Sequence, residues 1–132
     1  MEVDTEDSNR IITAVRIRPL SSEETSKGSN IVASADYHRN EIILLNPVFF
    51  KSSQQTERLR KLEERRFACD HVFWSVEETH ADYCGQEDVY SKVGSPIVQN
   101  ALAGLNCCMF AYGKDATVVP SYYLFIICRA NR

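Results

Sequence analysis

Asn106–Gly113 reads Asn-Cys-Cys-Met-Phe-Ala-Tyr-Gly, and this stretch decides how the chain is organised. A run of apolar residues without polar alternation predicts a buried parallel strand. A glycine directly after such a strand opens the phosphate-binding motif G-x-x-x-x-G-K-[ST], in which backbone amides and a lysine hold phosphates. Gly113 fills the first position, but the second glycine, the lysine and the hydroxyl residue are replaced by Val118, Val119 and Pro120. The sequence therefore predicts the approach to a nucleotide site without the site itself.

The residues before this strand predict a helix and an earlier strand. Apolar residues recur at helical spacing over Gln86–Leu105, and Gly85 occupies the predicted cap position before them. Pro96 lies inside this pattern and predicts a kink or a split, and Gly104 is a stop signal. Phe67–Phe73, with Trp74 at its end, reads as the preceding strand. Strand, helix and strand make a βαβ unit, whose crossover is expected to be right-handed.

The rest of the chain divides by composition into strands, polar links and tails. Ile11–Ile17 is rich in β-branched residues and predicts the first strand, which ends before Pro19. The other segments are a tail over 1–10, a loop over 21–30, short strands at 31–33 and 41–45 around a polar turn at 36–40, a charged insertion or frayed helix over 52–66, a loop over 75–85, and a tail over 114–132 with a β-prone run over 122–128.

The composition is that of an ordinary globular protein. Of the 132 residues 44% are hydrophobic and 25% are charged, and the formal net charge is −3. The chain has no excess of basic residues of the kind that would indicate a nucleic-acid partner. The acidic, polar N-terminus does not resemble a secretory signal, and the longest apolar stretch is too short to span a bilayer. We expect a cytoplasmic protein without a membrane span.

The cysteines favour free thiols over a disulfide framework, because their number is odd and no C-x-x-C pair occurs: Cys69, Cys84, Cys107, Cys108 and Cys128. One cluster contains residue types that bind zinc: Cys69, His71, His80 and Cys84. Its spacing fits no familiar zinc pattern. Ordinary strand and loop residues are therefore the favoured interpretation, and we predict no metal site.

Two arginines lie near the carboxyl end of the first predicted strand. Arg16 and Arg18 share one face there, and Pro19 follows. Ligands of open α/β sheets bind beyond the carboxyl ends of the strands, so these three residues are candidates to border a ligand. The alternative is two solvated arginines before a turn, which the pattern alone favours.

Four segments, taken in order, resemble the N-terminal part of a kinesin motor domain, and the resemblance covers Ile11–Gly113. They resemble the family's first strand with its R-x-R-P ending, its second main strand, the start of its first long helix, and the strand entering the phosphate loop. The segments are Ala14–Leu20, Phe67–Ser75, Gln86–Tyr90 and Gly104–Gly113. The aromatic pair Phe73–Trp74 and the longer loop after it are most similar to the vesicle-transporting kinesin branch.

The resemblance implies an α/β fold: a truncated, partial P-loop NTPase-like motor with a mixed sheet and flanking helices. It implies a microtubule-stimulated ATPase of the cytoskeleton, with ATP and Mg²⁺ as nucleotide and cofactor. By this resemblance Arg16, Arg18 and Pro19 line the adenine pocket, and Gly113 begins the phosphate loop. The chain lacks the rest of that loop and ends before the two switch motifs. We therefore assign no catalytic residue and expect no productive nucleotide binding.

Three functions follow from this sequence. The first is a kinesin-like motor protein that is inactive as this chain. The second is a non-catalytic protein that binds microtubules or another motor, with the basic run Arg58–Arg66 as a contact. The third is a small α/β binding domain whose likeness to kinesins is accidental.

Because the resemblance stops at Gly113, we interpret the sequence from Lys114 as foreign to the motor, from an alternative exon, a retained intron or a mistaken gene model. We also expect poor stability or aggregation.

Overall fold

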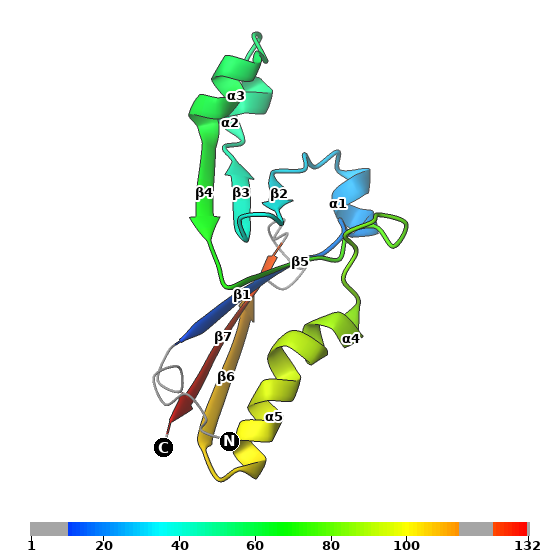
Figure 1. The fold of residues 1–132 in the computed structure, drawn as a ribbon. Coiled ribbons are helices and arrows are strands. Elements are labelled where there is room, and N and C mark those ends of the chain that lie inside the picture. The colour runs from blue at the N-terminus through cyan, green and yellow to red at the C-terminus, as the bar shows by residue number, and fades with distance from the viewer. Residues whose placement is uncertain (1–10, 114–122, 132) are drawn as a thin grey trace.

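The computed structural model describes residues 11–113 and 123–131. They form two sheets with helices beside them, and β1 of one sheet packs against the other sheet (Figure 1). The elements among these residues are β1 (Ile12–Ile17), α1 (Ser22–Ser26), β2 (Ala33–Asp36), β3 (Glu41–Leu45), α2 (Val48–Lys51), α3 (Glu57–Glu63), β4 (Glu64–Ala68), β5 (His71–Trp74), α4 (Gln86–Val89), a π-helical segment (Tyr90–Gly94), α5 (Ser95–Leu102), β6 (Asn106–Gly113) and β7 (Tyr123–Asn131).

The main sheet has the strand order β5-β1-β7-β6. β1 and β5 are parallel, and β7 is antiparallel to both β1 and β6. It follows that β5, β1 and β6 all run in one direction. This confirms that β5 and β6 are parallel strands joined by a helix, with two strands lying between them. The predicted right-handedness of this crossover stays a prediction.

The position of β6 differs from the expectation of a buried strand. β6 lies at the edge of the main sheet, and Met109 and Phe110 are 52% and 62% exposed. The central place beside it is taken by β7, which lies in the predicted β-prone tail. An apolar run signals a strand, but it cannot tell a central strand from an edge strand, because that depends on which segment pairs next to it.

β1 is buried on both of its faces. On one face Ala14 packs with Phe73 and with Val89 and Val93 of the helix. On the other face its neighbours Val15 and Ile17 pack against Ala33 and Ile42 of the small sheet. Alternate residues of a strand point to opposite faces, so β1 serves two separate clusters.

The long helix runs without a break from α4 through the π-helical segment into α5, alongside the main sheet (Figure 1). The π-helical turn Tyr90–Gly94 ends two residues before Pro96, where we predicted a kink or split. Gly85 is the cap, as predicted, and its amide donates a hydrogen bond to the carboxylate of Asp88 at 2.7 Å. Gly104, with a φ of 83°, ends the helix as expected. The buried stripe is narrower than predicted, since Tyr90, Val98 and Leu102 are exposed.

The small sheet is antiparallel, in the order β2-β3-β4. Its first strand begins at Ala33 and reaches Asp36, so the prediction of a strand at 31–33 was wrong in its bounds. The predicted single strand Phe67–Phe73 was also wrong, because β4 ends at Ala68 in the small sheet and β5 begins at His71 in the main one. The reason is a tertiary contact, because the carboxylate of Asp70 accepts hydrogen bonds from the amide of Thr13 in β1 at 2.8 Å and from the Thr13 hydroxyl at 2.9 Å. These bonds hold the chain where it changes sheets.

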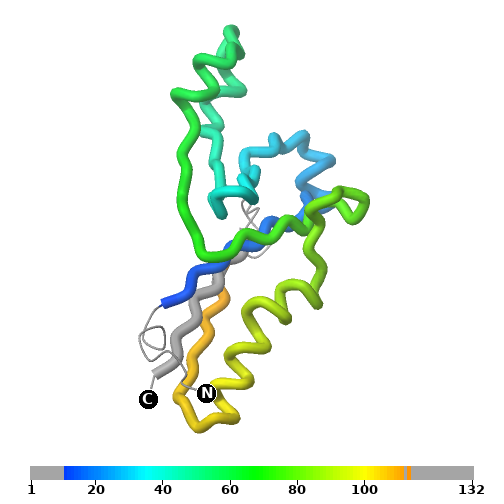
Figure 2. The backbone as a smooth tube through the Cα atoms, viewed as in Figure 1, coloured from blue at the N-terminus to red at the C-terminus, as the bar shows by residue number. Residues whose placement is uncertain are grey.

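The segment from α2 to α3 projects from the end of the small sheet, away from the main sheet (Figure 2). Thr56 caps α3 by accepting from the amide of Leu59 at 3.3 Å. No residue of α3 is buried, and Leu62 is 72% exposed. The expected frayed helix is therefore a short, exposed helix, and the last three residues of the predicted insertion already belong to β4. We call residues 48–63 the arm.

Candidate functional site

The parallel strands of the main sheet end together at one edge. Arg16 and Gly113 both pair with Leu124 of β7, so they lie in one row across the sheet, separated by one strand. At ordinary strand spacing their backbones are about 10 Å apart. Phe73 of β5 pairs with Arg16 and extends the same row. We call this end of the sheet, where the parallel strands have their carboxyl ends, the carboxyl edge, which is distinct from the lateral edges formed by the outermost strands. Open α/β sheets bind ligands there.

Arg16 joins three elements at this edge. Its Nε donates to Ser75 Oγ at 2.8 Å, and its Nη1 donates to Gln86 Oε1 at 2.7 Å. Ser75 is buried, donates its own hydroxyl to the carbonyl of Cys84 at 2.6 Å, and donates its amide to the carbonyl of Ile17 at 2.9 Å. The guanidinium thus fixes the end of β1, the loop after β5 and the start of α4 relative to one another.

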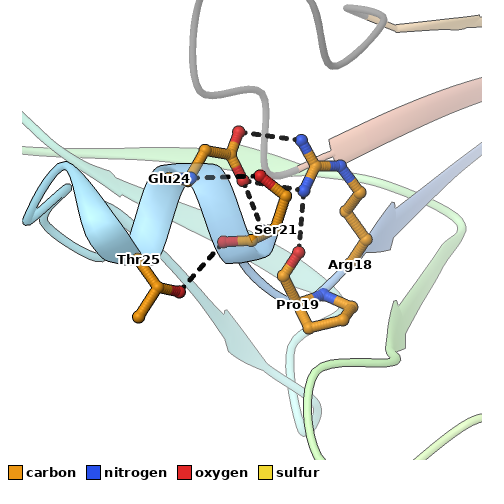
Figure 3. A network of polar contacts seen from close by, with 5 residues as sticks. All are labelled: Arg18, Pro19, Ser21, Glu24 and Thr25. Carbon is orange, nitrogen blue, oxygen red and sulfur yellow. Dashed lines mark hydrogen bonds and ion pairs between the residues drawn. The ribbon is translucent and has the colours of Figure 1, made fainter.

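Arg18 forms a two-pronged ion pair with Glu24 of α1 (Figure 3). Its Nη1 and Nη2 each donate to one carboxylate oxygen at 3.0 Å, and Nη1 also donates to the carbonyl of Pro19 at 2.7 Å. Ser21 completes the network, because its amide donates to Glu24 at 2.7 Å and its hydroxyl accepts from the amide of Glu24 at 3.2 Å. The Arg18 guanidinium and the Ser21 amide hold the pKa of Glu24 down at about 2.

The outcome for the two arginines is a correction of the pattern-based interpretation. They are half-buried and internally bonded, not solvated. We had predicted a loop over residues 21–30, where the structure has the helix α1. A signal for it was present, since Ser21-x-x-Glu24 has the S-x-x-E form of a capping box. No sequence signal identified Ser75 or Gln86, because their contact with Arg16 depends on the tertiary fold.

The remaining predicted site residues are less engaged. Pro19 and Gly113 are both exposed at the carboxyl edge. Val118, Val119 and Pro120, where the phosphate motif fails, lie outside the described residues. The structure therefore brings Arg16, Arg18, Pro19 and Gly113 to one edge of the sheet.

The residues weighed as a zinc site do not assemble. Cys84 packs against the cluster on the helix side of the sheet, and Cys69 packs against the cluster on the opposite side. His80 lies near the Trp74 ring, with ring centroids 6.1 Å apart. Burial raises the pKa of the Cys69 thiol, and the nearby Asp70 raises it further, which disfavours the thiolate that metals bind. Within the described part of the chain no group of metal-ligand types is placed to hold an ion, and Cys69, Cys84, Cys107 and Cys108 are free thiols.

The comparisons with known proteins agree with this fold. The family profile described as kinesin motor domain matches residues 16–117. Kinesin-like protein KIF13B of Homo sapiens is 37% identical over 110 residues, which cover 83% of this chain and 6% of that protein. StAR-related lipid transfer protein 9 of Mus musculus is 32% identical over 104 residues, which cover 79% of this chain and 2% of that protein. This chain thus spans only a small part of the length of these relatives.

A solved structure of a KIF14 dimer, in a two-heads-bound state with AMP-PNP and in complex with a microtubule, has a TM-score of 0.56 to this chain. The two are 29% identical, and the match covers 74% of this chain and 23% of that one. The fold defines an α/β protein with a mixed sheet. The chain belongs to the kinesin motor domain family.

The family implies a nucleotide and Mg²⁺, and the described groups at the carboxyl edge do not fit the metal. Mg²⁺ prefers oxygen ligands from carboxylates, hydroxyls and phosphates. Glu24 is held by Arg18, Asp88 in the first turn of α4 accepts from the amide of Gly85, and the Ser75 hydroxyl is bonded to Cys84 and Arg16. Among the described residues no helix combines the length and the apolar character needed to cross a bilayer.

Proposed function

We propose that this chain is a kinesin-like microtubule protein that does not turn over ATP. The observation that carries the proposal is the carboxyl edge. There Gly113 lies in row with Arg16 at the end of β6. In the phosphate motif that Gly113 would open, the sequence has Val118, Val119 and Pro120 in place of the second glycine, the lysine and the hydroxyl residue. Without the lysine and the hydroxyl, nothing in the loop pairs the β- and γ-phosphates or orients Mg²⁺.

In this proposal the remaining residues of the carboxyl edge keep the positions that the kinesin family implies for them. Arg16, Arg18 and Pro19 would border an adenine ring, and Gly113 would be the first glycine of the loop. The internal bonds of both arginines support this placement, because a side chain fixed by a second group is pre-organised for a ligand. Assignment to the vesicle-transporting branch, and a place on the cytoskeleton in the cytoplasm, belong to the same proposal.

The test restores the phosphate motif. In V118G/V119K/P120S, residues 113–120 read Gly-Lys-Asp-Ala-Thr-Gly-Lys-Ser, which satisfies G-x-x-x-x-G-K-[ST]. We expect no measurable ATP turnover by the natural chain, with or without microtubules, and tighter binding of a fluorescent ATP analogue by the triple variant. V118A/V119A/P120A is the matched control, which removes the same residues without restoring the motif. Microtubule-stimulated turnover by the natural chain would overturn the proposal.

A second function is favoured by the surface of the arm and the strand after it. Arg58, Lys61 and Arg65 are exposed and make no ion pair with any other described residue, whereas Arg66 pairs with Glu41 at 3.3 Å. Leu59 and Leu62 line an open hollow beside Arg58, together with hydroxyl groups of the preceding loop. A projecting basic surface with apolar residues suits contact with an acidic protein surface, such as that of a microtubule.

Microtubule co-sedimentation of R58E/K61E/R65E tests this second function. Because these side chains have no internal partner in the described structure, the substitutions should leave the fold intact and weaken binding at least tenfold. R39E is the control, since Arg39 is exposed at the far end of the same sheet. Equal binding by the triple variant, R39E and the natural chain would exclude the arm as the contact.

A further inference from the structure

The outer edge of β6 differs from every other sheet edge among the described residues. β6 has eight residues, and none of them is charged or proline: Asn-Cys-Cys-Met-Phe-Ala-Tyr-Gly. It is the last strand of the main sheet, with β7 on one side and no strand on the other. Such an edge presents a row of unpaired backbone N–H and C=O groups, and proteins normally protect it.

The other three edges carry that protection. β2 is only four residues long and ends in Asp36. β4 begins with three consecutive charged residues, Glu64, Arg65 and Arg66. β5 is also four residues long, and the chain folds back over its end, where Trp74 bridges to Tyr83 and its carbonyl accepts from the amide of Cys84 at 2.7 Å. Among the described edge strands, β6 alone is both long and uncharged.

We propose that β6 pairs with β6 of a second copy of this chain, in antiparallel orientation, so that two four-stranded sheets become one continuous sheet. A partner strand with charged residues would place those charges opposite the apolar residues of β6, whereas a second copy of β6 brings no charged residue to the pairing. Met109 and Phe110 lie at the middle of the strand, point to opposite faces and are both more than half exposed. Antiparallel self-pairing centred on either of these residues sets that residue opposite its own copy, and it covers both side chains by cross-strand contacts.

The second copy is favoured over an open-ended fibre because the described part of each chain has one such edge. Antiparallel pairing of identical strands is a two-fold, isologous contact, which uses the same surface on both copies and closes at the dimer. Growth beyond two copies would need a second unprotected edge, and the edges of β2, β4 and β5 do not provide one.

The test measures the mass of the full 132-residue chain by size-exclusion chromatography with light scattering, over a range of concentrations. We expect a concentration-dependent species of twice the 15.0 kDa chain mass. M109K and F110K, each placing a charge in the middle of the edge, should weaken the dimer at least tenfold. L102K is the matched control, because Leu102 is an apolar residue of α5 that is 84% exposed and lies off the edge. It should leave the dimer unchanged.

Amide hydrogen exchange gives a second measurement that does not depend on variants. In a monomer, alternate amides of residues 106–113 point away from β7 and exchange freely, and in the dimer they gain protection as the concentration rises. A natural chain that stays monomeric at several hundred micromolar overturns the proposal. So does a dimer that resists M109K and F110K but is lost in L102K, or a species that grows without limit.

Discussion

Placing β7 at the centre of the main sheet makes a sharp prediction about proline. Consecutive residues of a strand direct their backbone N–H groups to opposite neighbours, so in a central strand both partners matter. Ile126 pairs with Ala14 and Ala111, and Ile127 pairs with Thr13 and Phe110. Proline removes the N–H and is tolerated only where that group faces solvent, at a sheet edge. I126P and I127P should therefore both destabilise the fold.

The magnitude follows from one broken ladder bond in each variant. The lost bond is worth about 1 kcal/mol net, and an acceptor left buried without a partner costs about 1–3 kcal/mol more. The expected loss is thus about 2–4 kcal/mol for each substitution. With an m-value of about 1.5 kcal/mol/M in urea, the unfolding midpoint falls by roughly 1–3 M. Where stability is too low to leave a folded baseline, loss of amide protection at Ala14 is the readout.

Urea unfolding followed by circular dichroism is the assay, and I126V and I127V are the controls that keep the N–H. An edge strand would tolerate one of the two prolines and not the other. A tail outside the sheet would tolerate both. If either variant unfolds at the same urea concentration as its valine control, the central position of β7 is refuted.

Two further substitutions test the core and the ion pair. F73A removes a fully buried ring and should cost about 3–5 kcal/mol in unfolding free energy, whereas F67A, at a side chain that is 50% exposed, should cost under about 1 kcal/mol in the same urea titration. Equal losses would contradict the two-sided burial of the main sheet. The pKa of Glu24 is lowered from its ordinary 4.5 to about 2 by Arg18, so the unfolded chain takes up its proton first as the pH falls. The stability from this pair is therefore present above about pH 4.5 and lost between there and pH 2. The melting temperature should fall less steeply over that interval in E24Q than in the exposed control E23Q, and parallel pH profiles would refute the role of the pair.

The sequence by itself determined the family and most of the elements. The β-branched run of β1, the helical spacing after Gly85 and the apolar run of β6 are local patterns. Each predicted the type of its element correctly, although β6 is an exposed edge strand and not the buried strand that we expected. The four ordered segments predicted a kinesin motor domain, which the family match confirmed. The failed phosphate motif is likewise a property of the sequence, because it depends on which residues occupy 118–120.

Only the tertiary structure decided where these elements lie. The chain leaves the small sheet at Ala68 and enters the main sheet at His71, within what the sequence presents as one continuous strand. Arg16 and Arg18 became internal anchors because Ser75, Gln86 and Glu24 arrive from other elements. These outcomes depend on pairings between residues far apart in the chain, which local spacing does not encode.

The stretch Asn106–Gly113 shows the division most clearly. Its apolar character determined that it forms a strand, and its final glycine marked the carboxyl edge. The tertiary structure decided that β7 fills the central place beside it and that no described strand pairs with its other side. The physical reason is that the backbone N–H and C=O groups of a strand form hydrogen bonds with whichever strands the fold places beside it. An apolar sequence shows that a strand will form, but it does not show which other strands will pair with it.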